Sequence, residues 1–311
     1  MSDRWLALIV AALLAAPPAA AQRVRPDLDG IWSNRSLTTL ERRPAFKTLT
    51  LSEAEARAAE KALDGRPAIP ADEVGQVETE WWEPGLALAR VDGQARTSWI
   101  VEPADGRLPY SEAGLKALTA AQAADRNAFD GPEVRPGPER CLMGGGGATG
   151  PPIQNPVYNG NYRIVQTPDH VVIVSEMIMN ARIIPLRPMP PLPESMRPWT
   201  GDPSGRWEGD TLVVETRGLH PGAAWRMPSR LYLSKDARVV ERFTRVSETE
   251  LRYAFTVEDP TVFTRPWRAE MLLRPATAPM FEYACHEGNY SLFGALAGAR
   301  RIERDAATPS P

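Results

Sequence analysis

Alternating apolar and polar positions dominate the second half of this chain. Between residues 250 and 258, one parity carries Leu251, Tyr253, Phe255 and Val257, whereas the other parity is mostly charged or polar. Alternation of this kind is typical of an antiparallel strand with one buried face. We therefore predict mainly β structure from Asn161 onward.

Similar segments follow one another with short connections. The predicted strands cover residues 162–167, 170–177, 181–186, 211–216, 231–234, 238–246, 250–258, 267–274 and 280–284. Short loops such as 235–237 indicate a meander. A flat meander of this length would leave two long edges exposed, and closure removes them. We predict an antiparallel barrel or barrel-like sandwich, with a few N-terminal helices packed outside.

The N-terminal part has a mixed pattern. Ser52 and Glu55 form a capping-box signature, which predicts a helix over 51–63, and a second helix is predicted over 111–124. Strands are expected near 28–32 and 96–101. We therefore divide the mature chain into an N-terminal extension, 22–140, and a barrel-like core, 141–303, which together form one domain. A disordered tail is expected over 304–311.

The first 21 residues have the pattern of a secretory signal peptide. Arg4 precedes an apolar run, and Ala19, Ala20 and Ala21 fit the small-residue rule for cleavage. The run is too short to span a bilayer comfortably. We expect a soluble protein that is periplasmic or secreted and has no membrane span in its mature form.

Charge and cysteine content narrow the picture further. A formal net charge of -3 gives no electrostatic footprint for nucleic acid. Cys141 and Cys285 are the two cysteines of the chain, and in an oxidising compartment we predict a disulfide between them. The alternative is a reactive thiol or a metal ligand beside His286.

The densest group of chemically active side chains lies at residues 283–290. It holds Tyr283, His286, Glu287, Asn289 and Tyr290 next to Cys285. His286 is a candidate general acid/base, because the ordinary pKa of histidine lies near neutral pH. Asn289 and Tyr290 are candidate donors to a developing oxyanion. We expect neither a metal nor a cofactor, because no second histidine follows His286 at zinc-helix spacing.

Charged residues also interrupt predicted strands. Glu176 ends an apolar run, and a buried glutamate needs a partner. Arg182 on the next predicted strand is the expected partner. The pair either fixes the strand register or contributes Glu176 as an acid/base group and Arg182 as an anion-binding group. Glu241 faces the same way as Val239 and Phe243, and it too is expected in an ion pair.

Long motifs suggest relatives. They are residues 139–142, 158–168, 176–185, 201–216 and 283–290. With these motifs the chain resembles a large family of exported bacterial proteins that lack an assigned activity, over most of 31–300. In the second motif-bearing strand the family usually has a histidine where this chain has Met179. A site that uses that histidine would be altered or lost here.

We expect the barrel to bind a small, partly aromatic or apolar molecule in its lumen. The residues predicted to contact it are Arg182, Tyr158, Tyr162, Trp207, Tyr283, Asn289 and Tyr290. The alternative is a cofactor-independent lyase, isomerase or hydrolase, with His286 as general acid/base and Glu176 or Glu287 as its partner. A third possibility is a structural role for the polar cluster.

Overall fold

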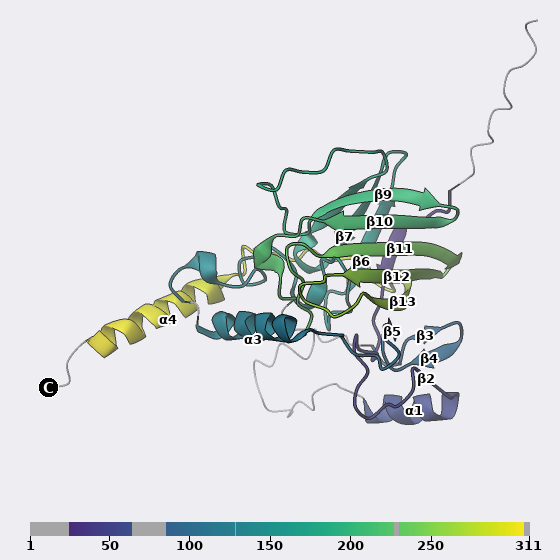
Figure 1. The fold of residues 1–311 in the computed structure, drawn as a ribbon, viewed down its shortest axis with the longest axis horizontal. Helices are drawn as coiled ribbons and strands as arrows, with labels where there is room; N and C mark the ends of the chain where they lie inside the picture. The colour runs from purple at the N-terminus through teal and green to yellow at the C-terminus, as the bar shows by residue number, and fades with distance from the viewer. Residues whose placement is uncertain (1–24, 64–84, 128, 227–229, 308–311) are drawn as a thin grey trace, which may run out of the picture.

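The computed structural model describes residues 25–63, 85–127, 129–226 and 230–307 (Figure 1). The predicted signal peptide therefore lies outside the described residues. A large antiparallel sheet has the strand order β8-β7-β6-β1-β13-β12-β11-β10-β9, and β5 pairs with β13. Its strands are β1 (Gly30–Ser33), β5 (Ile100–Glu102), β6 (Asn161–Gln166), β7 (His170–Ser175), β8 (Ala181–Pro185), β9 (Asp202–Glu208), β10 (Thr211–Arg217), β11 (Arg238–Ser247), β12 (Glu250–Glu258) and β13 (Trp267–Pro275).

The remaining elements are short or helical. A second sheet has the order β2-β4-β3. Its strands are β2 (Thr50–Leu51), β3 (Arg90–Val91) and β4 (Gln94–Arg96). The described α-helices are α1 (Glu53–Ala62), α3 (Glu112–Asn127) and α4 (Tyr290–Ala307). Single 3-10 turns are η1 (Pro132–Val134), η2 (Gly145–Gly147), η3 (Met177–Met179) and η4 (Pro221–Ala223).

The large sheet curls into a nearly closed barrel. Its two end strands, β8 and β9, contact each other, but these two described strands are not paired by β-sheet hydrogen bonds. Gly205 of β9 allows this approach: a Cβ there would lie 2.7 Å from Cγ2 of Ile184. Glycine in a strand often marks such close contact. The prediction of a mainly antiparallel, barrel-like fold is confirmed.

The N-terminal extension builds part of the barrel. β1 lies between β6 and β13, with Trp32 opposite Tyr162 in the register. β5 adds to β13 through Ile100 and Glu102. The first forty residues therefore supply an internal strand of the large sheet, and they do not simply cover it.

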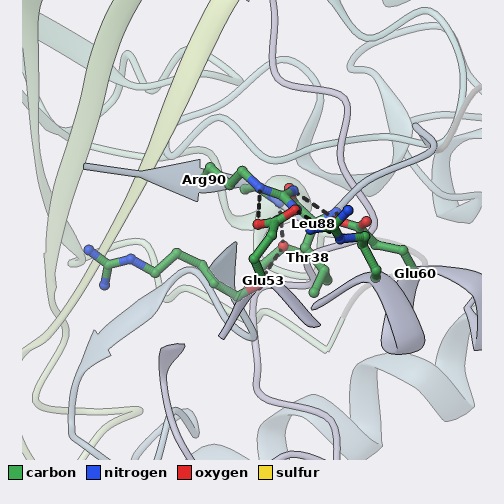
Figure 2. Close-up of polar contacts among 8 residues, drawn as sticks. Thr38, Glu53, Glu60, Leu88 and Arg90 are labelled. Atoms are coloured by element: carbon green, nitrogen blue, oxygen red, sulfur yellow. Dashed lines mark hydrogen bonds and ion pairs between the residues drawn. The ribbon is translucent and has the colours of Figure 1, made fainter. Parts of the chain in front are cut away.

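A small subdomain of α1 and the β2-β4-β3 sheet carries its own ion-pair network (Figure 2). Ser52 caps α1 and forms the predicted capping box with Glu55. Arg90 bridges two positions of the helix, pairing with Glu53 at 3.0 Å and Glu60 at 2.8 Å. Glu60 also accepts a hydrogen bond from the backbone N–H of Leu88. These contacts fix the helix on the sheet.

The inward-facing side chains of the barrel form one hydrophobic core. Trp32, Tyr162, Phe243, Phe255 and Trp267 are all buried in it. The rings of Phe255 and Trp267 meet edge to face, with centroids 5.6 Å apart. Small closed barrels are commonly filled by their own side chains in this way.

Several parts of the secondary structure differ from the sequence-based expectation. The strand expected at 96–101 is divided between β4 and β5. Residues 202–208 form β9, although no strand was predicted between 186 and 211. Residues 231–234 were predicted as a strand but lie in a loop. Leu231 and Leu233 are buried there, and a single β-bridge joins Tyr232 to Trp225. Residues 280–284 are also irregular, with no strand.

The C-terminal end is helical. α4 continues to Ala307, into the segment expected to be a disordered tail, while 308–311 lie outside the described residues. No residue of α4 is buried, and the helix extends away from the barrel in Figure 1. None of the described helices is long and apolar enough to cross a membrane.

Candidate functional site

A buried ion pair lies in the barrel interior, but its partners differ from the expected ones. Arg182 of β8 pairs with Glu241 of β11, and its Nη1 donates to Oε1 of Glu241 over 3.0 Å. Tyr253 donates its hydroxyl proton to the same oxygen over 2.6 Å. Arg182 therefore neutralises Glu241, and the predicted pairing of Arg182 with Glu176 is wrong.

Burial and charge set the ionisation of this group. Burial strongly raises the pKa of Tyr253, and the neighbouring Glu241 carboxylate adds to the effect, so Tyr253 remains a proton donor. Burial works against the charged form of Arg182, but the attraction of Glu241 prevails and raises the pKa of Arg182. Arg182 and Glu241 compensate each other's charge inside the core, although Nε of Arg182 has no hydrogen-bond partner among the described residues. The triad therefore has no net charge to offer a ligand.

Glu176 is buried at the end of the barrel, where β7 gives way to the η3 turn. Its side chain is anchored by three N–H groups. Oε2 accepts from Nδ2 of Asn161 at 2.8 Å and from the Asn161 backbone N–H at 3.3 Å, and Oε1 accepts from the Phe281 backbone N–H at 3.0 Å. Glu176 is only 2% exposed, and no cationic side chain of the described residues pairs with it.

The segment 276–289, here called the C-terminal strap, leaves β13 and runs over this end of the barrel. Beyond the backbone hydrogen bond from Ala276 to Ile31 at its start, its first attachment is the contact of Phe281 with Glu176. The second is the disulfide between Cys141 and Cys285, which confirms the predicted pairing. The third is a hydrogen bond of 2.6 Å from Nδ2 of Asn289 to the backbone carbonyl of Glu139.

A cavity of about 750 Å³, here called the mouth pocket, lies between the strap and the barrel end. Its lining includes Glu176, Asn161, Phe281, Tyr283 and Asn289. Oδ1 of Asn161 is buried and has no hydrogen-bond partner among the described residues. The pocket therefore combines an aromatic wall with two fixed acceptors, the Glu176 carboxylate and the Asn161 carbonyl oxygen.

Other charged groups of the mouth pocket have partners or face solvent. Glu139 is held by Arg135 through two hydrogen bonds of 2.9 and 2.8 Å. Glu282 is exposed. Arg35 also lines the pocket, and this residue is not free of partners. Glu176 is thus the carboxylate in this lining that is both buried and without a cationic partner among the described residues.

Tyr283 of the mouth pocket lies beside Tyr158, which lines a neighbouring cavity. Burial raises the pKa of Tyr283, and the Tyr158 phenol adds to this effect. The structure therefore brings three of the predicted catalytic or ligand-contacting residues, Glu176, Tyr283 and Asn289, to the mouth pocket.

The remaining predicted residues lie elsewhere. His286 and Glu287 are exposed and do not line the mouth pocket, and the His286 imidazole makes no hydrogen bond with any described residue. Tyr290 is 80% exposed on α4. Tyr162 is buried in the barrel and donates to the Gln154 carbonyl. Trp207 packs half-buried against the core from β9.

Sequence reasoning missed Asn161 and Phe281. Asn161 begins β6 directly opposite Ser33 in the register, so it looked like an ordinary strand terminus. Phe281 contributes its backbone N–H, which no side-chain pattern reveals. The signal that could have found Asn161 is its place in the motif that begins at Tyr158.

Met179, which stands where the resembling family has histidine, lies in the η3 turn with a φ of 51° and is partly exposed. It does not line the mouth pocket. Among the described residues, no group of three or more histidine, cysteine or acidic side chains is placed to hold a metal ion.

Comparison with known proteins adds no further constraint. The chain matches no family model, no curated protein and no solved structure. Membership of the exported bacterial family therefore remains a prediction from the motifs.

Proposed function

We propose that this protein binds a small molecule with an aromatic or apolar body in the mouth pocket, and that the ligand donates a hydrogen bond or a positive charge to Glu176. The observation that carries the proposal is a buried carboxylate without a cationic partner at the wall of a cavity. Burying an uncompensated carboxylate is costly, and a bound donor offsets that cost.

The geometry of Glu176 also favours binding. Three N–H groups hold the carboxylate in one orientation, while its lone pairs are not all used. Asn161 presents a second acceptor oxygen without a partner. A cavity of about 750 Å³ with an aromatic wall and a few placed polar groups is typical of small-molecule sites. A protonated aromatic amine satisfies both requirements.

The site lies at the mouth of the barrel and not deep in its lumen. The inward-facing residues of the strands are buried against one another, and Arg182 and Glu241 already compensate each other's charge. The proposal therefore keeps the kind of ligand expected from the sequence and moves its position.

The enzymatic alternative is less favoured. General acid/base catalysis requires the acting group within hydrogen-bonding reach of the substrate. His286 and Glu287 lie outside the mouth pocket, so neither can act on a molecule bound beside Glu176 without rearrangement of the strap.

A thermal-shift screen with a panel of arylalkylamines, each paired with the alcohol of the same body, tests the proposal. Amines should raise the melting temperature of the native protein more than their alcohols do. Glu176→Gln removes the charge, and Phe281→Ala removes an exposed ring from the wall; both should reduce the shift. Glu194→Gln is the matched control, because Glu194 is 93% exposed and lines neither the mouth pocket nor its wall.

No shift with any amine, or shifts that persist in both pocket variants, would contradict the proposal. Phe281→Ala keeps the proposal testable if Glu176→Gln fails to fold. Phe281 is 63% exposed and contributes little to the core, so its replacement should leave the fold intact.

A further inference from the structure

A second cavity, here called the arginine hollow, lies next to the mouth pocket and has a volume of about 810 Å³. Residues that are adjacent in the sequence line different cavities. Glu176 and Asn159 line the mouth pocket, whereas Met177 and Tyr158 line the hollow. The two cavities are therefore neighbours, but their linings differ in charge.

Among the described residues, four arginines line the hollow, against one carboxylate. They are Arg42, Arg43, Arg107 and Arg230, and the carboxylate is Glu41. Glu41 compensates little of this charge, because its closest approach to Arg230 is 3.9 Å. Its other oxygen accepts the backbone N–H of Leu108 over 3.0 Å.

Arg42 is the most informative of the four. It is only 6% exposed, and its guanidinium donates to two backbone carbonyls, those of Ala104 at 3.0 Å and Lys47 at 3.4 Å. No carboxylate of the described residues pairs with it, and its Nε has no hydrogen-bond partner among them. A buried arginine without a counterion is costly, and an anion supplies what is missing.

A second buried donor at the hollow has no partner. Gln154 is 5% exposed, and its Nε2 makes no hydrogen bond with the described residues, although its backbone carbonyl accepts from Tyr162 and Asn34. Amide and guanidinium groups both donate, so these residues add donors, not acceptors, to the lining of the hollow.

The rest of the wall is apolar. Leu37, Leu108 and Met177 are buried at the hollow, and Leu40 and Val157 extend the same surface. A cavity that offers both an apolar wall and several donors suits a ligand with an apolar body and an anionic group.

We propose that the arginine hollow binds an organic anion, a carboxylate or sulfonate carried on an apolar or aromatic body. The site is distinct from the mouth pocket and does not rest on the function proposed for it. The two neighbouring cavities then select ligands of opposite charge.

Titration calorimetry with 2-naphthylacetate tests this inference, with the neutral 2-naphthylacetamide as the matched ligand. The amide should bind about ten-fold more weakly, which is the lower range for losing a charged hydrogen bond. The double variant Arg43→Gln with Arg107→Gln should weaken naphthylacetate by a similar factor. Both arginines are exposed, and neither forms an ion pair with a described residue, so the fold should persist.

Arg163→Gln is the control, because Arg163 is an exposed arginine of β6 that lines neither cavity. It should leave binding unchanged. Absence of naphthylacetate binding, equal binding of the amide, or an equal loss in Arg163→Gln would overturn the inference. Tighter binding in Glu176→Gln without a loss in the double arginine variant would also overturn it, since the anion would then occupy the mouth pocket, where removal of the carboxylate relieves repulsion.

Discussion

Glu176 and Glu241 are both buried glutamates at barrel positions, and they differ in what compensates their charge. Glu241 faces Arg182 and the Tyr253 hydroxyl inside the core. Glu176 receives only N–H dipoles from Asn161 and Phe281. A fully paired charge is a structural element, whereas an unpaired buried charge beside a cavity is a candidate for binding.

Parity along the strands correctly predicted that Glu241 would face inward and form an ion pair, but it did not identify the partner. β8 and β11 are not neighbours in the sheet, so Arg182 reaches Glu241 across the barrel interior. Contacts across a lumen leave no periodic signal in the sequence, because they depend on how the sheet closes.

Removing one partner of the interior pair should be strongly destabilising. We expect Glu241→Leu to lower the free energy of unfolding by about 3–5 kcal/mol, because it leaves Arg182 buried without a counterion. The double variant Arg182→Met with Glu241→Leu should lose less than the single variant. Urea denaturation measures the free energy of unfolding of the double variant and of Glu241→Leu and Arg182→Met alone. If the loss in the double variant equals the sum of the two single losses, the two side chains are not coupled and the prediction is contradicted.

The outer surface of the barrel should contribute an acid-sensitive component. Hydrogen bonds from Arg238 at 2.6 Å, and from Arg217, lower the pKa of Glu215 to about 2, despite opposition from burial. Because the folded-state pKa is depressed, this stabilisation is present above pH 4.5, the ordinary pKa, and is lost as the pH falls toward 2.

Glu215→Gln should therefore cost about 1 kcal/mol at neutral pH, as expected for a partly exposed network. The difference from the native protein should shrink between pH 4.5 and 2. Chemical denaturation at a series of pH values measures this, with Glu194→Gln as the exposed control. A constant difference across that range would show that Glu215 is not the titrating group.

Among the elements, alternation worked best where strands are long and one face is buried. β12 occupies Glu250–Glu258, the segment predicted from its pattern. β9 was missed because Pro203, Gly205 and Gly209 read as turn residues, although Gly205 serves close packing against β8. α4 was missed because its apolar residues are exposed and its first turn adjoins the polar cluster.

The C-terminal strap has no helix or strand of its own, so its position depends on its attachments. The double variant Cys141→Ser with Cys285→Ser should lower the free energy of unfolding by about 2–4 kcal/mol. Backbone amides of 276–289 should exchange faster, while those of β11 and β12 should not change at low denaturant. Reduction of the native protein should reproduce both effects and leave the variant unaffected; equal exchange in native and variant proteins would contradict this role of the disulfide.

At the scale of the whole molecule, the sequence predicted a barrel and a polar group near its C-terminal end, and both are present. Only part of the predicted site comes together in the structure. Glu176, Tyr283 and Asn289 line the mouth pocket, whereas His286 and Glu287 are exposed to solvent. The reason is the strap, whose path is fixed by the disulfide and by Phe281, a backbone contact without a sequence signature.

The barrel thus provides a filled, rigid wall, and the cavities form where loops and the strap cover its end. The mouth pocket presents acceptors, and the arginine hollow beside it presents donors. We therefore propose that ligands bind at the covered end of the barrel and not in its interior.

Hydrogen exchange of the protein with and without a stabilising arylalkylamine tests that assignment most directly. Protection should appear in the strap at 276–289 and around Asn161 and Glu176, while the amides of β10, β11 and β12 remain unchanged. Protection confined to inward-facing positions of those three strands, with none in the strap, would contradict the account.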